Sequence, residues 1–482
     1  MHLTTICRII GMLLMIFSLT MALPAALAAI YQDGALGAFS YAFGLTFLSG
    51  LSLWALSRGK QPDLGIRDGF LVVALFWTVL GLFGALPFYL ADNPGLSVSA
   101  AVFESVSGLT TTGATVITGI DDLPISILFY RQFLQWLGGI GIIVIAVAIL
   151  PILGIGGMQL YRAETPGPVK DNKLTPRITG TAKALFFMYV AMTLACTLAY
   201  WAAGMSFFDA ICHSFSTVAI GGFSTHDASM GYFDSPLILL ICTVFMLIAG
   251  MSFAIHYHVW RSGRVRLYMQ DSETKFYLGV IATATLSVCG YLIFSGEQTP
   301  LDGIINGLFH TVSIATTAGF GADDFAAWPS FLPVGLLLLS FIGGCAGSTG
   351  GGMKAVRVML VAKQGIRELK QLIHPSAVIP LKIGSHRVEA KVVSAVWSFF
   401  GVYLISFLAI TLAMMACGLD FLSAFSATAA SINNMGPGLG EVAANYSTVS
   451  HTGKWILCYA MLLGRLEIFT LLVILLPAFW RR

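Results

Sequence analysis

The sequence predicts an all-α polytopic membrane protein. Four pseudo-repeats of helix, pore loop and helix are expected to surround one axis, with two more membrane helices before them. Of the 482 residues, 57% are hydrophobic and only 10% are charged. A soluble domain carries about 25% charged residues, so a soluble fold could not bury this much apolar surface. Membrane-length apolar stretches recur along the chain, and four glycine-centred turns lie between them.

The same composition excludes other classes of protein. A net charge of +3 leaves no strongly basic surface for nucleic acid. The eight cysteines lie mostly singly inside apolar runs, with no CxxC pair and no Cys/His metal spacing. We therefore expect them to act as small apolar filler.

The first segment has two interpretations. Arg8, the apolar stretch Ile9–Leu23 and the small residues up to Ala29 resemble a cleavable signal peptide. We favour an uncleaved first membrane helix, followed by a second over Ala35–Leu56. Residues 1–68 are then expected to form two N-terminal membrane helices.

Four pairs of membrane-length stretches follow. They are Phe70–Leu90 with Phe129–Leu153, Ala184–Ala203 with Leu237–Trp260, Phe276–Phe294 with Phe331–Val361, and Val392–Cys417 with Trp455–Phe479. Each pair encloses a segment of 13 to 17 residues, too short to span a bilayer. These segments are Leu96–Thr111, Phe207–Ala219, Leu301–Thr317 and Phe421–Asn434. We expect each to be a half-membrane helix, within repeats of about 100 residues. The predicted repeats are 69–165, 166–270, 271–375 and 376–482.

A glycine turn ends each predicted half-helix. The turns read TTTGAT around Gly113, AIGGFS around Gly222, TTAGFG around Gly319 and NNMGPG around Gly436. Non-helical backbone at membrane depth is costly unless it is buried or lines a water-filled path. Glycine lets consecutive carbonyls point one way, and a ring of carbonyls can replace the hydration shell of an ion. A single such turn could be ordinary helix packing, but four in one orientation favour one ion pore.

The expected ion ligands are backbone carbonyls of three residues in each turn. They are Thr111, Thr112 and Gly113, then Ile220, Gly221 and Gly222, then Thr317, Ala318 and Gly319, then Asn434, Met435 and Gly436. Divalent metals prefer carboxylates, and the turns contain no ring of Asp or Glu. Monovalent cations are therefore the expected substrate.

Charged residues indicate the orientation of the turns. Lys and Arg concentrate in alternate loops, within residues 58–67, 162–183, 261–275 and 354–391, and at the end of the chain. The turns lie instead near acids, which are Asp121, Asp122, Asp227, Asp234, Asp323, Asp324 and Glu441. The positive-inside rule then makes the basic loops cytoplasmic and the turns outward-facing.

A glycine-rich run, FIGGCAGSTGGGMK at residues 341–354, interrupts the third repeat's second helix. Glycine costs about 1 kcal/mol relative to alanine inside a helix, so regular helix is not expected here. A phosphate loop is excluded because Met353 stands where a lysine is required. Close helix packing through small residues remains an alternative for part of the run.

Two charged residues, Arg465 and Glu467, lie inside the last predicted membrane segment. Charges there are costly and usually functional. Two residues apart on a helix, they are not expected to pair with each other.

An intramembrane enzyme would need a catalytic group. The candidates are Glu104, His213 and His310, each nine residues before its glycine, and we interpret them as anchors of the half-helices.

The four turns are the motifs by which the chain resembles the Trk/Ktr/HKT superfamily of potassium transporters, from about residue 70 to its end. The extra N-terminal pair of segments is similar to the TrkH branch. Members with serine at the first filter position tend to admit sodium, whereas this chain has glycine at all four, which favours potassium.

The resemblance implies potassium uptake across a bacterial inner membrane, with the turns facing the periplasm, and no enzymatic activity. It implies that the Gly-rich run is a mobile loop below the filter. The implied gate comprises Gly347, Ser348, Thr349, Gly350, Gly351, Gly352 and Arg465. The alternative within transport is sodium- or proton-coupled potassium symport.

The resemblance also implies partners. The chain has no nucleotide-binding signature and is expected to bind no cofactor, so potassium is only its substrate. The basic loop at residues 354–391 suggests a cytoplasmic partner, which in the superfamily is a regulatory ring of the TrkA type that binds NAD and adenine nucleotides. A homodimer surrounded by membrane lipid is implied as well.

Overall fold

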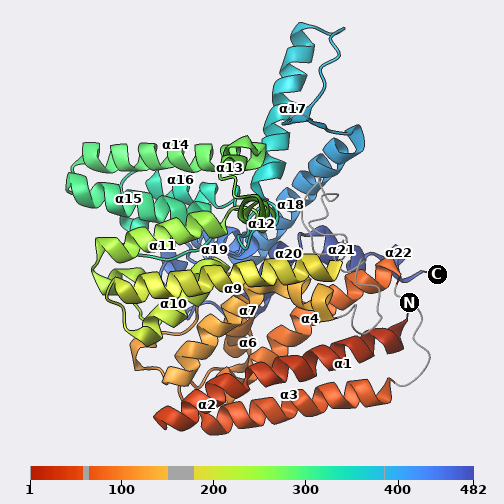
Figure 1. The fold of residues 1–482 in the computed structure, drawn as a ribbon, viewed down its shortest axis with the longest axis vertical. Coiled ribbons are helices and arrows are strands. Elements are labelled where there is room, and N and C mark those ends of the chain that lie inside the picture. Colours follow the sequence, from red (N-terminus) through yellow and green to blue (C-terminus); the bar gives the residue numbers. More distant parts are fainter. Residues whose placement is uncertain (1, 58–64, 150–177, 385, 482) are drawn as a thin grey trace.

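The computed structural model describes residues 2–57, 65–149, 178–384 and 386–481. Helices form nearly all of its regular structure, and many run side by side across the molecule (Figure 1). Six described helices are long and apolar enough to cross a membrane, and two bent helix pairs would raise that number to eight. The predicted all-α membrane fold is confirmed.

The first three helices are α1 (Leu3–Thr20), α2 (Ala22–Tyr31) and α3 (Leu36–Leu56). Helices α1 and α3 cross where Gly11 faces Gly50. A Cβ on either glycine would lie 2.6 Å from the carbonyl oxygen of the other. Small residues at a membrane helix crossing allow this close approach of two backbones.

Four groups of elements follow. The first contains α4 (Ile66–Gly84), α5 (Leu86–Leu90), α6 (Val98–Leu109), η1 (Ile120–Asp122) and α7 (Ile125–Ile149). The second contains α9 (Ile178–Ala202), α10 (Phe207–Ala219), η2 (Ser229–Phe233), α11 (Pro236–Ala249) and α12 (Phe253–Ser262). The third contains α13 (Arg266–Gln270), α14 (Ser272–Ser295), α15 (Pro300–Ala315), η3 (Phe325–Ala327), α16 (Leu332–Leu339) and α17 (Ala355–Ile373). The fourth contains β1 (Lys382–Ile383), β2 (His386–Arg387), α18 (Ala390–Ala416), α19 (Phe421–Ile432), η4 (Gly440–Val442), α20 (His451–Arg465), α21 (Phe469–Leu475) and α22 (Pro477–Trp480).

Each group contains one short helix where the sequence predicts a half-helix: α6, α10, α15 and α19. Side-chain caps explain where three of them begin. The Ser206 hydroxyl accepts from the Asp209 N–H, the Thr299 hydroxyl from the Asp302 N–H, and the Asp420 carboxylate from two N–H groups of α19. Such caps satisfy N–H groups that the first helical turn leaves without partners.

Two predicted continuous spans are wrong. The stretch Leu237–Trp260 is two helices, α11 and α12, bent by 92°, and the stretch Trp455–Phe479 is broken between α20 and α21 by 117°. At the second break, Glu467 and Ile468 have φ of 54° and 55°, which end a right-handed helix. The first break lies within apolar sequence, so hydropathy did not indicate it. The second break contains Glu467 and directly follows Arg465, two charges that the sequence analysis noted without inferring a break. The end of the predicted stretch Phe129–Leu153 lies partly outside the described residues.

The third group's second helix is interrupted where the sequence predicts it. Helix α16 ends at Leu339, irregular backbone follows, and α17 begins at Ala355. Helix α17 then projects beyond the other helices (Figure 1) and carries exposed apolar side chains, including Ile366 and Leu369. A two-stranded antiparallel hairpin, β1 with β2, follows it.

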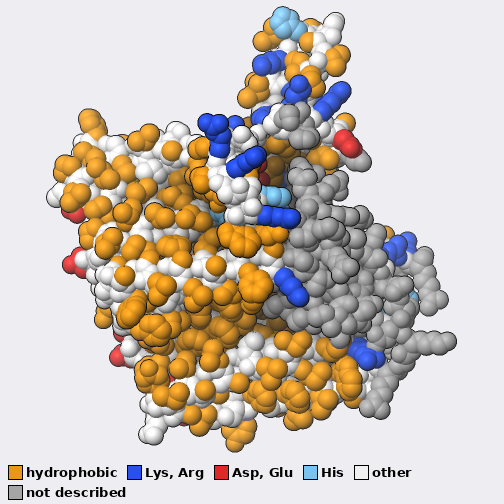
Figure 2. Space-filling model, viewed as in Figure 1, with side chains coloured by type: hydrophobic (Ala, Val, Ile, Leu, Met, Phe, Trp, Pro, Cys, Tyr) orange, Lys and Arg blue, Asp and Glu red, His pale blue; other side chains and the backbone are white. Residues whose placement is uncertain are grey.

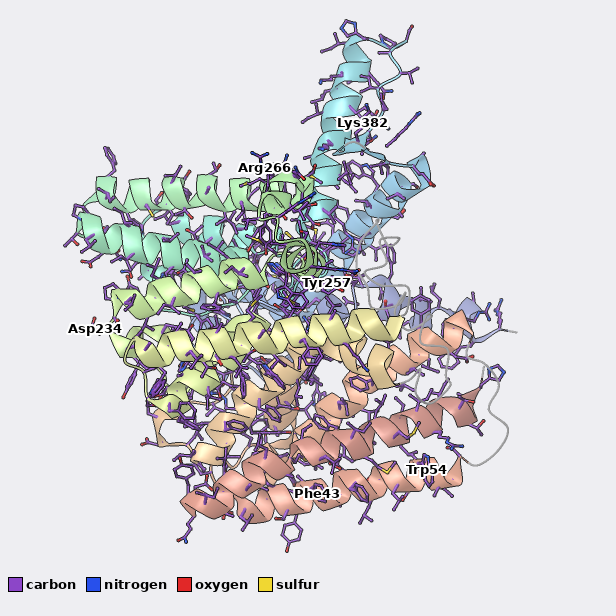
Figure 3. The ribbon with its side chains drawn as sticks, in the orientation of Figure 1. Phe43, Trp54, Asp234, Tyr257, Arg266 and Lys382 are labelled. Carbon is purple, nitrogen blue, oxygen red and sulfur yellow. The ribbon has the colours of Figure 1, made fainter. Side chains whose placement is uncertain are left out.

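Charge is distributed unequally over the visible surface. Figure 2 shows most of the visible Asp and Glu along the left edge of the view, with acidic atoms also at the upper right, and Lys and Arg towards the centre, top and right, over a mainly apolar surface. Figure 3 places Asp234, after η2, at the left end of the helices, whereas Trp54 of α3 lies towards the right end. Acidic and basic side chains thus concentrate on different parts of the surface, and the orientation of the turns across the membrane stays a prediction.

Candidate functional site: a ring of four glycine turns

Each short helix ends with a residue in the left-handed conformation, two positions before the turn glycine. These residues are Thr111, Ile220, Thr317 and Asn434, with φ of 54°, 54°, 71° and 53°. None is glycine, so each carries a strain of about 1–3 kcal/mol that the surroundings must offset. Repetition of this strain in all four groups points to a function.

The same two hydrogen bonds close every one of these helix ends. The N–H of the residue before the glycine donates to a carbonyl five residues back, at 2.7 to 2.8 Å, in the pairs Thr112 to Ser107, Gly221 to Ser216, Ala318 to Ser313 and Met435 to Ala430. The left-handed residue donates to the carbonyl three residues back. Together these bonds form a Schellman motif, which directs the chain out of the helix.

The four turn glycines face one another in a closed ring. Their φ values are 83° at Gly113, 78° at Gly222, 77° at Gly319 and 98° at Gly436. A Cβ on Gly113 would overlap the carbonyl oxygen of Gly221. The same holds for Gly222 with Ala318 and for Gly319 with Met435, and a Cβ on Gly436 would lie 2.7 Å from the Thr112 carbonyl. Each glycine thus contacts the next group's turn, and the fourth contacts the first. The structure brings all twelve predicted ligand residues into this ring of turns.

Glu104 on α6 ties the first turn to its own half-helix. Its carboxylate accepts from the Thr115 hydroxyl and from the Val116 N–H, both at 3.0 Å. It also accepts from Arg131 Nε on α7 at 2.8 Å, and both side chains are fully buried. Arg131 in turn donates to the Ser224 carbonyl, just beyond the second turn. One buried ion pair therefore joins the first and second turns.

Side chains on the other half-helices make similar contacts, from the position nine residues before the glycine in the second and third groups and ten residues before it in the fourth. His213 on α10 bonds the Ser224 hydroxyl at 2.9 Å, and His310 on α15 bonds the Asp323 carbonyl at 3.1 Å. In the fourth group the Ser426 hydroxyl accepts from the Leu439 N–H at 2.8 Å. Each side chain fastens its half-helix to the chain that returns from the turn.

Several residues at the turns were missed by the sequence analysis. Gln135 on α7 donates to the Gly221 carbonyl and accepts from the Phe223 N–H. Tyr446 donates to the Gly436 carbonyl at 2.8 Å. Arg131 and Gln135 are polar residues within a predicted membrane stretch, and that unusual placement is the signal that could have identified them.

The Gly-rich segment lies directly against the inner ends of the half-helices. The Thr349 hydroxyl donates to the Val218 carbonyl at 2.9 Å, the Gly351 N–H donates to the Thr317 hydroxyl at 2.7 Å, and the Gly352 N–H donates to the Asn433 carbonyl at 3.0 Å. A Cβ on Gly351 would overlap the Asn433 carbonyl oxygen. The segment therefore contacts three of the four groups where their half-helices end.

Glu273, in the first turn of α14, holds the backbone on both sides of residues 347–352 within the Gly-rich segment. Its carboxylate accepts from the Ala346 N–H at 2.7 Å and from the Val356 N–H at 3.2 Å. Lys354, which is 7% exposed, donates from Nζ to the Gly350 carbonyl. The segment is thus fixed at its ends by side chains that the sequence did not single out.

Arg465 lies beside this segment at the end of α20. Its guanidinium donates to the Thr349 carbonyl at 3.3 Å, to the Gly138 carbonyl at 2.5 Å and to the Thr111 hydroxyl at 3.4 Å. The interpretation that Arg465 and Glu467 lie on one continuous helix is wrong, because the chain breaks at Glu467. Glu467 pairs instead with Arg357 on α17, at 2.5 Å between Nη2 and Oε2.

In the part of the chain that the structure describes, metal binding and catalysis have no assembly comparable to the ring of turns. Among the described residues, no group of three or more His, Cys, Asp or Glu side chains could hold a metal ion. His256 on α12 bonds the Tyr268 hydroxyl and the Ile248 carbonyl, which is a structural role. Glu104, His213 and His310 each bind their own return strand instead of converging on one centre.

Comparison with known proteins identifies the relatives of this chain. The TrkH family model, described as a cation transport protein, matches residues 37–481. The Trk system potassium uptake proteins TrkH of Vibrio parahaemolyticus and of Escherichia coli are 56% and 53% identical, and each alignment covers 100% of both chains. Trk system potassium uptake protein TrkG of Escherichia coli is 39% identical over 100% of this chain and 99% of its own. The crystal structure of the potassium transporter TrkH from Vibrio parahaemolyticus matches with a TM-score of 0.91 and 53% identity, over 100% of both chains.

The buried pair Glu104–Arg131 yields a stability prediction. Arg131→Met leaves the Glu104 carboxylate buried without its countercharge, and breaking a buried pair from one side costs about 3–5 kcal/mol. We expect a clear loss of thermal stability, measured on the detergent-solubilised protein by size exclusion after heating. The matched control is Arg367→Met, whose partner Glu368 is 56% exposed, and it should cost no more than about 1 kcal/mol. Equal losses in the two variants would contradict this assignment.

Proposed function

The chain belongs to the TrkH family of cation transport proteins, and on that premise we propose that it takes up potassium through the ring of four glycine turns. The family transports cations and is not a family of enzymes. The relatives named above are potassium uptake proteins, and the solved relative is a potassium transporter. The single observation that carries the proposal is the closed ring, in which each turn glycine meets the carbonyl of the next turn.

In the proposed filter, potassium is bound by backbone carbonyls of the twelve turn residues already named. Two features of the geometry support this role. The left-handed residue and the glycine of each turn both have positive φ, which redirects the carbonyls away from the helix axis. The half-helices also end at the ring, so the negative ends of their dipoles lie beside it. Both features favour a cation at the centre.

The proposed gate comprises the Gly-rich residues 347–352 and Arg465. These residues contact the ends of the half-helices, below the turns, through the bonds of Thr349, Gly351 and Gly352. Arg465 adds a positive charge at the same level and holds the Thr349 carbonyl. A movement of α17 would act directly on this gate, because α17 follows the segment and pairs with Glu467 through Arg357.

The remaining assignments are part of the same proposal. Residues 1–68 form an N-terminal pair of helices, and four pore repeats cover 69–165, 166–270, 271–375 and 376–482. The basic loops, including the projecting α17, face the cytoplasm, and the turns face the periplasm. A nucleotide-binding regulatory ring of the TrkA type docks on the basic loop at residues 354–391, and the protein forms a homodimer. The uneven surface charge and the exposed apolar residues of α17 support these placements.

Uptake of rubidium into liposomes that contain the purified protein tests the function directly. We expect potassium-loaded liposomes to take up rubidium without a sodium or a proton gradient, because a carbonyl filter needs no co-substrate. Uptake that appears only with one of those gradients would support the coupled symport alternative. Complete absence of uptake by folded protein would contradict the proposal.

The filter assignment predicts the effect of Gly113→Ser. The added Cβ overlaps the Gly221 carbonyl, so the ring must widen, and we expect the potassium/sodium permeability ratio to fall about tenfold, equal to about 1.4 kcal/mol. The matched control is Gly44→Ser on α3, where a Cβ would meet no atom within 4 Å. Reversal potentials measured in planar bilayers give the ratio. A ratio as high as that of the control would exclude this turn from the filter.

The gate assignment predicts an order of flux among variants of Arg465. Two unit charges about 4 Å apart interact by about 4 kcal/mol at an effective dielectric of 20, so removing the guanidinium should raise potassium flux. Arg465→Lys keeps the charge but cannot bridge several carbonyls. We therefore expect Arg465→Ala to conduct most and wild type least, with lysine between them, in rubidium uptake per folded protein. The control Arg261→Ala, on the exposed end of α12, should match wild type. Alanine at or below wild type would refute the gate.

A further inference from the structure

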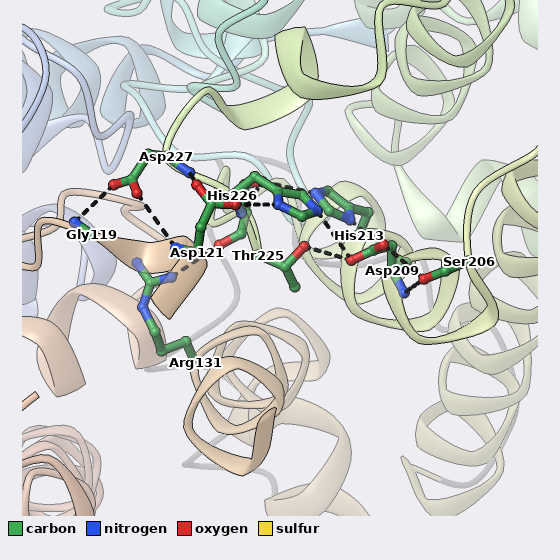
Figure 4. A network of polar contacts seen from close by, with 10 residues as sticks. Gly119, Asp121, Arg131, Ser206, Asp209, His213, Thr225, His226 and Asp227 are labelled. Carbon is green, nitrogen blue, oxygen red and sulfur yellow. Dashed lines mark hydrogen bonds and ion pairs between the residues drawn. The ribbon is translucent and has the colours of Figure 1, made fainter. Parts of the chain in front are cut away.

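A cluster of charged side chains joins the loops outside the first and second turns (Figure 4). We name it the outer clamp and define it as Asp121, Asp209, His226 and Asp227. His226 is central: its Nδ1 lies 2.5 Å from an Asp121 oxygen, and its Nε2 lies 3.5 Å from an Asp209 oxygen. The imidazole side chain is only 14% exposed. One ring therefore lies between two carboxylates that come from two different groups of the fold.

The backbone of each loop completes the outer clamp reciprocally. The Asp227 N–H donates to the Asp121 carboxylate at 3.2 Å, and the Asp121 N–H donates to the Asp227 carboxylate at 3.4 Å. The Asp227 carboxylate also accepts from the Gly119 N–H at 3.1 Å. The carboxylates of Asp121 and Asp227 are thus held across the boundary between the first and second groups, and the His226 ring contacts the first of them directly.

The outer clamp is connected to the second turn through Ser224, two residues after Gly222. The Ser224 hydroxyl accepts from the His226 N–H at 3.1 Å and bonds His213 Nε2 at 2.9 Å, while its carbonyl accepts from Arg131. A displacement of His226 therefore moves the atom that the first group's buried arginine holds. No residue of the proposed filter binds His226 itself, so an effect on selectivity passes through Ser224 or through the first group's loop at Asp121.

We propose that His226 is a positioning residue for the second filter turn, and that its protonated ring holds the outer loops of the first and second groups together, so that selectivity depends on the pH of the outer solution. This inference rests on the proposed function, because it assumes that the glycine ring selects the ion. It concerns residues outside the ring, which are reached from one side of the membrane only.

The groups that face His226 determine the direction of the pH dependence. They are Asp121 from η1, Asp209 and His213 from α10, Tyr232 stacked on the ring from η2, Asp227 beside it, and Arg131 beyond Ser224. Burial disfavours the charged ring, but the bonds and charges of Asp209 and Asp121 outweigh burial and raise the pKa of His226 above its usual 6.5. Burial alone would raise the pKa of Asp121, yet the bonds from His226 and Asp227 lower it below its usual 3.8.

The direction of the pH dependence follows from the pKa shifts of His226 and Asp121. A raised His226 pKa means that its contribution is complete below about pH 6.5 and disappears as the pH rises through the folded value. A lowered Asp121 pKa means that the carboxylate contribution persists above about pH 3.8 and is lost only in stronger acid. The outer clamp is therefore strongest in mildly acidic solution and weakens at alkaline outer pH.

The test is the potassium/sodium permeability ratio of the full-length protein in planar bilayers, with the pH of one chamber varied from about 5 to 9, around the histidine range. We expect the wild-type ratio to fall about two- to fivefold at alkaline pH, the size expected for loss of a partly exposed ion pair. The fall should occur only when the chamber facing the turns is titrated. His226→Asn should show the low ratio at every pH. The matched control is His258→Asn, an exposed histidine on α12, which should keep the wild-type profile.

A second variant distinguishes an effect of His226 protonation on selectivity from an effect of its packing alone. Asp121→Asn removes one of the two acids that raise the His226 pKa, so the midpoint of the profile should move to lower pH. Wild type and His226→Asn with the same pH profile would overturn the inference, and so would an unmoved midpoint in folded Asp121→Asn. Absence of potassium-selective current at every pH would instead contradict the proposed function. A selective but pH-independent current would contradict the outer clamp alone.

Discussion

The rest of the structure depends on how four half-helices end inside the protein. A helix end leaves its last carbonyls without helical hydrogen-bond partners. Within a membrane, the protein itself must supply such partners or direct these carbonyls to a ligand. Here each end adopts a left-handed residue and a Schellman motif, which turns the chain and frees the next carbonyls from the helix. The glycine that follows then fits against the neighbouring turn only because it has no Cβ. The strained left-handed residue, the Schellman hydrogen bonds and the close approach of the glycine therefore occur together in each of the four turns.

The four turns share backbone geometry but differ in what fastens them. The first is held by the buried ion pair Glu104–Arg131, the second by His213 and Gln135, the third by His310 and the fourth by Ser426 and Tyr446. A buried ion pair resists displacement more strongly than a neutral hydrogen bond, because a separated charge stays desolvated. The first two turns are also joined to each other through Ser224. The ring is closed in backbone terms, yet its four sides are held with unequal stiffness.

The sequence predicted the backbone features better than the side-chain partnerships. Half-helix Phe207–Ala219 coincides with α10, and the turn glycines and the Gly-rich interruption could be located, because glycine and short apolar segments leave local signals. The break at Gly250 could not be located because the sequence around it is apolar, and the break at Glu467 was missed because Arg465 and Glu467 were placed on one continuous helix. Glu104 was singled out by its spacing, but its partner Arg131 lies on another helix, and nothing in one sequence pairs them. The same limit applies to Glu273, whose two N–H donors lie more than 70 residues away.

The inner end of the proposed pathway is held by a different kind of contact from the outer end. Outside the turns, carboxylates and an imidazole hold the loops together. Inside, Arg465 donates to the Gly138 and Thr349 carbonyls and to the Thr111 hydroxyl, which are neutral oxygens. Neutral oxygens are also what a dehydrated monovalent cation requires. If the pathway follows the axis of the ring, the guanidinium blocks it by occupying ligands as well as by repulsion. Arginine suits this position because its charge is permanent and its planar fork reaches several acceptors at once. In the proposed gate, opening would require those oxygens to be released, and a movement of the Gly-rich backbone would also break its bonds to Val218, Thr317 and Asn433 at the ends of the half-helices.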